Sequence, residues 1–442
     1  MTPPASPAFS DFTTAACILF VFLVPLAAAG LALINTGLGR SRSAAHSMMA
    51  SLAVFSVAAV VFFFCGFAFQ GFAGGPGHSL SIAGKSWGWI ADQPFFFRGL
   101  KFDGSAAPLI AWLQMLSVGL AAIIPLGSGG DRWRLGACCA SSALFAAFTY
   151  PIFAHWAWGG GWLAQLGANY GLGRGFVDAG GSGTIQVVGG LTALAVAWIL
   201  GPRRGKYAAD GMPAAIPGHN AVLVLFGCML ALLGWYGLNS AGAILFAAAD
   251  ARRCVLIAIN TTLSAAAATL AAALVTRFRF GKPDASLCAN GWVGGLVASS
   301  AAAPFLAPAA AMLIGLIAGG LVALSVEWFE VRFQVDDPGG AVSVHAVCGV
   351  WGLLALGICA RMLGQSLNGA SGNAGQWLAQ VVGIATLFGF VLPLTYGLNW
   401  LLNRFYPQRV AAEGERQGLD LHELGAGAYP EFLTHTDDFL QR

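Results

Sequence analysis

Long apolar stretches constrain the fold of this chain more than any other feature. Eleven of them approach the length of about 20 residues that an α-helix needs to cross a bilayer. They cover 14–36, 48–70, 107–127, 135–157, 184–202, 219–240, 253–276, 286–303, 307–329, 341–361 and 377–402. Only 9% of the 442 residues are charged, whereas soluble domains are about a quarter charged. The sequence therefore predicts an all-α, polytopic membrane protein in a lipid bilayer.

Charge and cysteine usage exclude several other classes of protein. The net charge of +3 is too small to indicate binding of nucleic acid. The nine cysteines include no CxxC pair, so neither a zinc site nor a disulfide framework is predicted. We expect no metal, no cofactor and no enzymatic activity. Because the first positively charged residue is Arg40, the first apolar stretch is expected to be a true span.

The loops indicate an orientation. Lys and Arg are more frequent in the loops after odd-numbered spans than in those after even-numbered spans. The positive-inside rule then places the N-terminus outside the cell and the tail, 403–442, in the cytoplasm. We expect 1–402 to form the membrane domain, in the inner (plasma) membrane. Two loops, 71–106 and 158–183, look structured rather than short.

Two matching segments indicate an internal repeat. Asp178–Gly190 reads "DAGGSGTIQVVGG" and Asp337–Gly349 reads "DPGGAVSVHAVCG". In each, a carboxylate is followed eight residues later by a polar side chain, Gln186 in the first and His345 in the second. Five predicted spans separate the two side chains. Because five is odd, the repeats must be inserted with opposite topology, as in many transport proteins.

The repeats are predicted to cover about 14–202 and 219–361, and the eleventh span, 377–402, lies outside them. In such architectures the functional site lies near the midplane, between the halves. Gln186 and His345 should therefore face each other close to the pseudo-two-fold axis.

The polar residues of the two segments have ordinary and functional interpretations. Asp178 and Asp337 can each cap the helix that follows by accepting hydrogen bonds from free backbone N–H groups. Asp178 could in addition attract a cation. An ionisable residue within a span marks a functional site by default, which favours a role for His345. The alternative is a neutral histidine that only bonds a backbone carbonyl.

Six motifs, taken in order, resemble the ammonium transporter family (Amt/Mep/Rh). They are "FAHWAWGGGWL" at 153–163, "FVDAGGSG" at 176–183, "GWYGLN" at 234–239, "FGKPDASLCANGWVGGLVA" at 280–298, "VDDPGGAVSVHAVCGVWG" at 335–352 and "GLDLHELGAGAY" at 418–429. The resemblance covers essentially the whole chain. It implies a homotrimer of eleven-span protomers, each with its own pore, an outer ammonium site, two gate phenylalanines and two pore histidines.

Three positions match the family pattern, and a fourth, the first pore histidine, is replaced. Trp158 matches the outer-site tryptophan, whose indole face can bind ammonium by a cation–π contact. Asp178 matches the aspartate beneath that site, and His345 matches the second pore histidine. Gln186 stands in place of the first. Glutamine can donate and accept hydrogen bonds, but it cannot carry a proton as an imidazole does.

Other positions depart from the pattern. Ser117 and Leu238 stand where the resemblance implies the two gate phenylalanines, and Gly242 stands where it implies a serine of the outer site. The tail keeps GLDL at 418–421 and then diverges. The resemblance thus describes a divergent member that lacks the first pore histidine and both gate phenylalanines.

Three functions remain open from the sequence. The first is transport of ammonium or ammonia with altered proton handling. The second is an ammonium sensor or non-conducting binding protein that signals through a separate partner. The third is passage of another small neutral molecule, which a pore widened at Ser117 and Leu238 would permit. The resemblance further implies a PII-type regulatory protein at the cytoplasmic face, and we expect the tail to pack along that face, between protomers.

Overall fold

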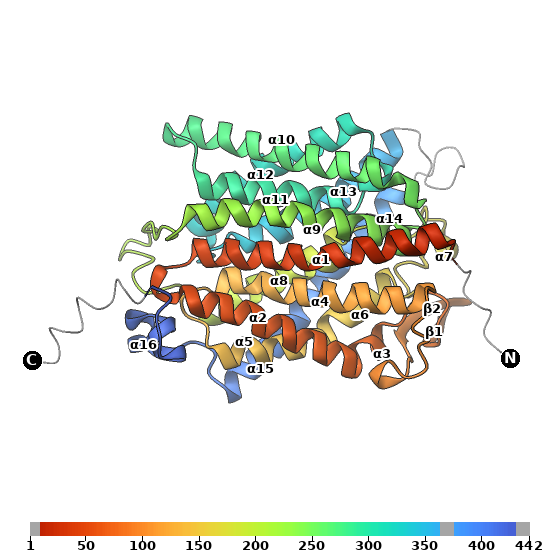
Figure 1. Ribbon diagram of the computed structural model, residues 1–442, viewed down its shortest axis with the longest axis horizontal. Helices are drawn as coiled ribbons and strands as arrows, with labels where there is room; N and C mark the ends of the chain where they lie inside the picture. The colour runs from red at the N-terminus through yellow and green to blue at the C-terminus, as the bar shows by residue number, and fades with distance from the viewer. Residues whose placement is uncertain (1–8, 363–374, 430–442) are drawn as a thin grey trace, which may run out of the picture.

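The chain forms a bundle of long, roughly parallel and antiparallel helices (Figure 1). The computed structural model describes residues 9–362 and 375–429, and within these ranges a helix occupies each of the eleven predicted spans. Ten stretches of helix are long and apolar enough to cross a membrane. The remaining span is α11 (Ala285–Ser300), which has 16 residues. The polytopic helical fold is therefore confirmed.

The spans are built from regular helices, several of which are extended by short π-helical or 3-10 turns. The α-helices are α1 (Asp11–Leu38), α2 (Ala44–Val61), α3 (Phe67–Gln70), α4 (Ala106–Gly129), α5 (Leu135–Leu144), α6 (Tyr150–Ala157), α7 (Leu166–Tyr170), α8 (Val188–Leu200), α9 (Ala221–Ala247), α10 (Cys254–Phe280), α11 (Ala285–Ser300), α12 (Pro308–Phe333), α13 (Cys348–Met362), α14 (Gln376–Thr386), α15 (Leu392–Phe405) and α16 (Ala412–Gln417).

Several of the short turns, among them η2, η4, η5, η8 and η9, continue these helices into longer spans. The π-helical turns are η2 (Phe62–Gly66), η4 (Phe145–Thr149), η5 (Ser182–Val187), η8 (Val342–Val347), η9 (Leu387–Val391) and η10 (Asp420–Leu424), and the 3-10 turns are η1 (Ser41–Ser43), η3 (Phe95–Phe97), η6 (Ala251–Arg253) and η7 (Ala303–Phe305). Single π-helical turns within helices often mark functional sites, and η5 and η8 begin the two spans that carry Gln186 and His345.

A β-hairpin was not part of the helical prediction. The loop 71–106 contains two antiparallel strands, β1 (Gly77–Ile82) and β2 (Lys85–Ala91). The two residues between them, Ala83 and Gly84, both have positive φ, at 50° and 72°, as a type I′ hairpin turn requires. The hairpin lies at one end of the bundle and α16 at the other (Figure 1). We call these ends the hairpin side and the tail side.

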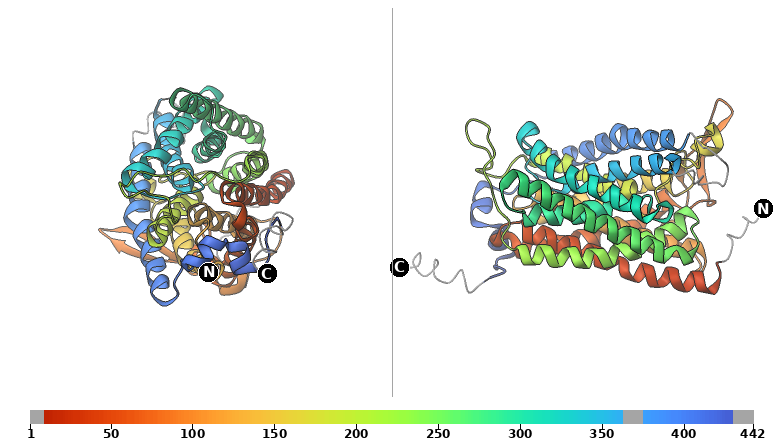
Figure 2. Two further views of the ribbon diagram at one scale, coloured as in Figure 1. Left: turned by 90° about the vertical axis from the view of Figure 1, so that its left-hand side faces the viewer. Right: turned by 90° about the horizontal axis from the view of Figure 1, so that it is seen from above.

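The packing follows the predicted internal repeat. The first span, α1, packs along α9, the sixth span, and the two lie side by side in both views (Figures 1 and 2). They meet at Gly30 and Gly227, where a Cβ on either glycine would lie 2.6 Å from the carbonyl oxygen of the other. Such close backbone approach is the usual reason for glycine in membrane helices. The contact is reciprocal, as expected at a pseudo-two-fold axis.

The fifth and tenth spans meet in the same reciprocal way. A Cβ on Gly190 would overlap the backbone of Ala346, and a Cβ on Gly349 would overlap the Val187 side chain. The two contacts are equivalent, because Gly349 lies 159 residues after Gly190 and Ala346 lies 159 residues after Val187, the same spacing that separates Gln186 from His345. The inverted repeat therefore places η5 against η8.

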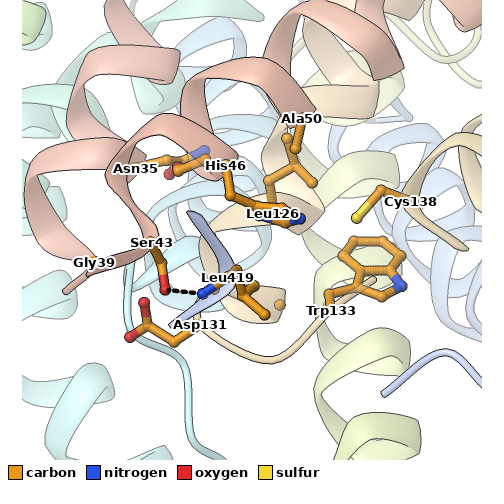
Figure 3. A pocket seen from close by; sticks show the side chains of 13 residues that line it. Asn35, Gly39, Ser43, His46, Ala50, Leu126, Asp131, Trp133, Cys138 and Leu419 are labelled. Atoms are coloured by element: carbon orange, nitrogen blue, oxygen red, sulfur yellow. Dashed lines mark hydrogen bonds between the residues drawn. The ribbon is translucent and has the colours of Figure 1, made fainter. Parts of the chain in front are cut away.

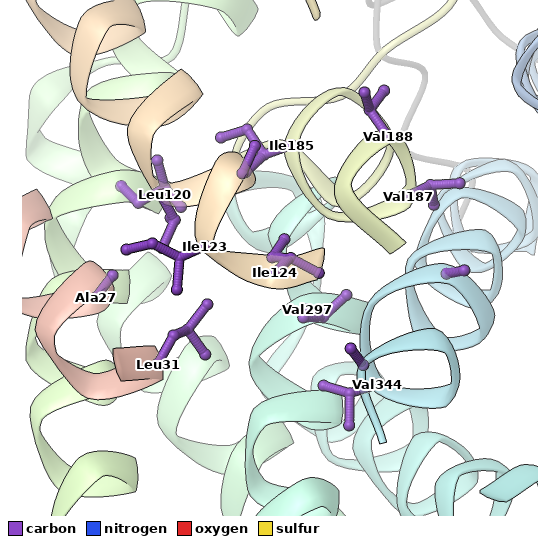
Figure 4. Close-up of a cluster of buried hydrophobic side chains, with 14 of the residues drawn as sticks. Ala27, Leu31, Leu120, Ile123, Ile124, Ile185, Val187, Val188, Val297 and Val344 are labelled. Carbon is purple, nitrogen blue, oxygen red and sulfur yellow. The ribbon is translucent and has the colours of Figure 1, made fainter. Parts of the chain in front are cut away.

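Branched apolar side chains fill the space around these two turns. Figure 4 shows such side chains from α1, α4, η5, α8, α11 and η8 gathered in one cluster. Ile123, Ile124, Ile185, Val297 and Val344 all belong to it and are nearly inaccessible to solvent. The polar residues of η5 and η8 consequently lie in an apolar environment, which strengthens any hydrogen bond that they make.

Candidate pore and hairpin-side site

Gln186 and His345 are in direct contact, as the repeat predicts. The Nδ1 atom of His345 lies 2.7 Å from the Oε1 atom of Gln186. Gln186 is fully buried and His345 is 5% exposed. An amide oxygen can only accept a hydrogen bond, so His345 Nδ1 carries the hydrogen and donates it. The contact selects the neutral tautomer in which His345 Nε2 has a free lone pair.

The amide nitrogen of Gln186 has no such partner. Gln186 Nε2 is buried and makes no hydrogen bond to any residue within 9–362 and 375–429. An unsatisfied buried donor costs roughly 1 to 3 kcal/mol. The pair therefore presents one unused donor, Gln186 Nε2, and one unused acceptor, His345 Nε2.

Asp178 caps the first of the two turns. Its carboxylate accepts hydrogen bonds from the N–H groups of Gly181, Gly183 and Thr184 at 2.8–3.1 Å and from the Thr184 hydroxyl at 2.9 Å. The capping prediction is confirmed. Burial raises the pKa of Asp178, and the hydrogen bonds from Thr184 and Gly183 oppose that rise. Because the side chain is 3% exposed, any effect on a cation acts through its field and not through contact.

Asp337 caps the second turn in the corresponding way. It accepts hydrogen bonds from the N–H groups of Ala341 and Val342, at 3.0 and 2.8 Å, and from the Ser128 hydroxyl, at 2.7 Å. Burial also raises the pKa of this carboxyl, again against the opposing hydrogen bonds. Both turns that carry the central pair thus begin at a buried aspartate.

Trp158 lies at the end of α6 on the hairpin side. Its indole N–H donates to the carbonyl oxygen of Asp178 at 2.7 Å, which links the tryptophan to the loop above η5. The Phe246 ring stacks on the indole, with centroids 4.3 Å apart and planes inclined by only 10°. One face of Trp158 is therefore covered by an aromatic ring.

Gly242 is held by close packing. A Cβ at this position would overlap the carbonyl oxygen of Ala179, one residue after Asp178. A serine cannot be accommodated here without a shift of the loop backbone. Glycine at this position thus allows α9 to lie directly against the loop backbone.

Ser117 and Leu238 occupy different environments. Leu238 is 1% exposed and belongs to the apolar core. Ser117 is equally buried and its hydroxyl donates to the Leu113 carbonyl at 2.8 Å. One turn away on the same face of α4, Gln114 accepts a hydrogen bond of 2.5 Å from the Tyr150 hydroxyl. Gln114 Nε2 is buried without a partner in the described ranges.

Neither Phe246 nor the Gln114–Tyr150 pair was predicted from the sequence. Phe246 is one of 31 phenylalanines, and nothing in its neighbourhood distinguishes it. Tyr150 and Gln114 are each polar residues within an apolar span, and that signal could have identified them. The seven predicted site residues divide into a hairpin-side group with Trp158, Asp178 and Gly242, a central pair, and the two gate positions.

Buried charges connect the halves at the tail side. Arg203 donates to Asp336 through Nε and Nη2, both at 2.9 Å, and to Asp131 through Nη1 at 3.1 Å. Arg132, fully buried, donates to the backbone carbonyl of Asp336 at 2.8 Å. Although burial alone would raise it, the pKa of Asp336 is lowered, by hydrogen bonding to Arg203 and by both arginines. Every charge of this network is compensated, which is typical of a structural role.

The tail binds the ends of the same chain's helices through its carboxylates. Asp420 accepts hydrogen bonds from the N–H groups of Ala45 and His46, at 3.1 and 2.7 Å, and so caps α2. Glu423 accepts one from Leu135 N–H at 3.1 Å and caps α5. The tail therefore connects the second and fourth spans.

A small pocket lies where the tail meets the bundle. His46, Asp131 and Leu419 are among its lining residues (Figure 3). About 20 Å³ is open to the centre of a water molecule, which suffices for roughly one water. His46 Nε2 is buried without a partner in the described part of the chain. The pocket suits a bound water and not a larger ligand.

Fold and site together define a class of protein. Two inverted five-helix repeats meet at a polar pair within an apolar core, which is the architecture of a membrane transport protein. The sequence model of the Ammonium Transporter Family matches residues 15–429. The chain belongs to this family.

Individual relatives support the assignment. The chain is 38% identical to the ammonium transporter Amt2 of Archaeoglobus fulgidus, over 93% of this chain and 87% of that protein. It is 31% identical to the ammonium transporter of Bacillus subtilis, over 94% and 97%. Among solved structures, a Sensor Amt Protein superposes with a TM-score of 0.83 at 28% identity, covering 93% of this chain and 98% of that one. Candida albicans Mep2 superposes at 0.78 and 22% identity, over 92% and 88%, which supports the fold alone.

Proposed function

We propose that the chain transports ammonium or ammonia across a membrane, with proton handling altered by Gln186. The observation that carries the proposal is the 2.7 Å contact between Gln186 and His345 inside an apolar core. An intact cation is costly to place there, whereas a neutral molecule of the size of ammonia is not. Ammonium would therefore release its proton before the central pair.

The unused atoms of the pair match ammonia. Ammonia can accept a hydrogen bond from Gln186 Nε2 and donate one to His345 Nε2. Ammonium has four donors and no lone pair, so it cannot satisfy the Gln186 amide. Gln186 cannot take up a proton from His345. The pair therefore cannot pass a proton from one side chain to the other, as two facing histidines could. Of the two side chains, only the His345 imidazole has a nitrogen that can take up and release a proton.

The test is flux and current recorded together on proteoliposomes after an ammonium step. The account predicts ammonium uptake that saturates and that depends on His345. Saturating uptake and current that are unchanged by His345→Ala would contradict the role of this residue.

A sensor is the second candidate, because a Sensor Amt Protein is among the structures that this chain resembles along nearly its whole length. The departures at Ser117, Leu238 and Gly242 also favour it. Tight ammonium binding without measurable uptake would support a sensor. Restored growth of a strain that lacks ammonium uptake would reject it.

We further propose the setting in which the pore operates. Residues 1–402 form the membrane domain of a homotrimer in the plasma membrane, with the hairpin side outside. The tail, 403–442, is cytoplasmic and contributes to the contacts between protomers. A PII-type protein is the expected partner at the tail side, and a pull-down with such a protein tests it. Cross-linking in native membranes tests the trimer.

A further inference from the structure

The Phe246 ring covers one face of the Trp158 indole, and an indole binds a cation through its face. Phe246 follows Gly242 by one turn of α9, so the two residues lie on the same side of that helix. Gly242 abuts the Ala179 carbonyl, and the neighbouring Asp178 carbonyl accepts the Trp158 N–H. The surface of α9 that faces the hairpin-side site therefore also covers the indole.

The ring spacing decides whether a cation can share this position. A cation–π contact places the ion over the ring face, within about 6 Å of its centroid. An ion between two rings needs van der Waals distance on each side, which separates the rings by roughly 7 Å. The observed centroids are 4.3 Å apart. Phe246 and a cation therefore exclude each other from this face of Trp158.

The surroundings of Phe246 allow it to move. The residue is only partly buried and lies at the border of the core cluster. It is the penultimate residue of α9, which ends at Ala247 before Ala248 with a left-handed φ of 52°. Backbone and side chain at a helix end are less restrained than in the middle of a packed span.

We propose that Phe246 is a lid that closes the Trp158 face and must be displaced before ammonium binds there. The inference rests on the proposed function and adds a residue that sets the affinity of the hairpin-side site. Neither gate position holds an aromatic ring, Ser117 and Leu238 being present instead, so Phe246 supplies a closing ring from another position. The binding-competent state is the one with the ring displaced, and the stacked state lowers the apparent affinity.

The experiment measures ammonium binding and uptake separately on purified full-length protein. Ammonium chloride is titrated by calorimetry in detergent, and uptake is recorded in proteoliposomes. Phe246→Leu removes the ring and keeps an apolar side chain, and Phe246→Tyr keeps the ring. Stacked aromatic pairs are stabilised enough that their loss corresponds to roughly 2- to 12-fold in an equilibrium constant. Phe246→Leu should lower the Kd for ammonium by that factor, and Phe246→Tyr should leave it near the wild-type value.

Two controls separate a lid from general packing. Phe102→Leu removes an aromatic ring that is 79% exposed, and it should leave the Kd unchanged. In a Trp158→Leu background, Phe246→Leu should no longer change the Kd. A Kd that is unchanged or raised by Phe246→Leu in the wild-type background, or no ammonium binding at all, would overturn the lid. Binding that shifts as predicted without uptake by any variant would support the lid and refute transport.

Discussion

The two halves of the repeat use the same scaffold and end in different chemistry. Each has a buried aspartate that caps a π-helical turn, and each places a polar side chain eight residues later against its counterpart. The first half contributes an amide and the second an imidazole. The two halves are thus alike at the aspartates that cap the turns. They differ at the Gln186–His345 contact, where a pair of histidines could transfer a proton.

The capping aspartates provide the largest expected difference between the halves. Asp178 accepts four hydrogen bonds, two of them from Thr184, and Asp337 accepts three. Asp178→Ala should cost about 3 kcal/mol of stability, because several buried donors lose a charged acceptor. Asp337→Ala should cost less. Thermal unfolding in detergent measures both, and an equal or reversed order would contradict the comparison.

Removing the His345 imidazole tests the contribution of the second half to transport. His345→Ala leaves the Gln186 carbonyl unpaired in an apolar core and should lower ammonium flux by roughly 10- to 100-fold. His345→Gln is the matched variant, since a glutamine can still donate to Gln186. It should retain more flux than the alanine variant in the same proteoliposome assay. Equal flux in both variants would show that the hydrogen bond is irrelevant.

The close contact between Gly242 on α9, in the second half, and Ala179, in the first half, should resist a larger side chain. Gly242→Ser forces the side chain against the Ala179 backbone and should destabilise the protein by about 2 kcal/mol. Gly320→Ser is the matched control, because no atom lies within 4 Å of a Cβ at Gly320 on α12. Comparison of the two melting temperatures gives the effect. If both substitutions lowered the melting temperature equally, close packing would not explain why position 242 is a glycine.

The smallest expected effect concerns the polar pair beside the first gate position. Tyr150→Phe removes the donor to Gln114, whose amide nitrogen already lacks a partner in the described ranges. The loss should cost about 1 kcal/mol. Tyr396→Phe, at a 40% exposed position, should be nearly neutral in the same unfolding assay. A stabilising Tyr150→Phe variant would contradict the assigned bond.

Features that depend on the length of apolar runs and on the spacing within the two repeated segments were predictable from the sequence. Apolar runs located the spans, although α9 continues to Ala247 where the prediction ended at 240, because its last turn is also apolar. The matched spacing of Asp178 to Gln186 and Asp337 to His345 predicted the central contact. The hairpin was missed since its Ala83–Gly84 turn lacks the usual Asn-Gly signal.

Contacts between distant segments were not predictable in the same way. Phe246 lies 88 positions after Trp158 and on another helix, so local pattern carries no information about their stacking. The backbone clash that keeps Gly242 a glycine depends likewise on where the loop after Asp178 comes to lie. The match to the family motifs predicted that Trp158 and Gly242 belong to the site. It could not predict that Phe246 covers one face of the Trp158 indole.

The most direct test of the account restores symmetry at the central contact. Gln186→His places a second imidazole opposite His345, and flux and current are recorded together for this variant and the wild type. Because an amide cannot pass on a proton and an imidazole can, we predict ammonium uptake by both proteins and a higher charge moved per ammonium by Gln186→His. An identical charge-to-flux ratio would contradict the claim that Gln186 sets the proton handling of this pore.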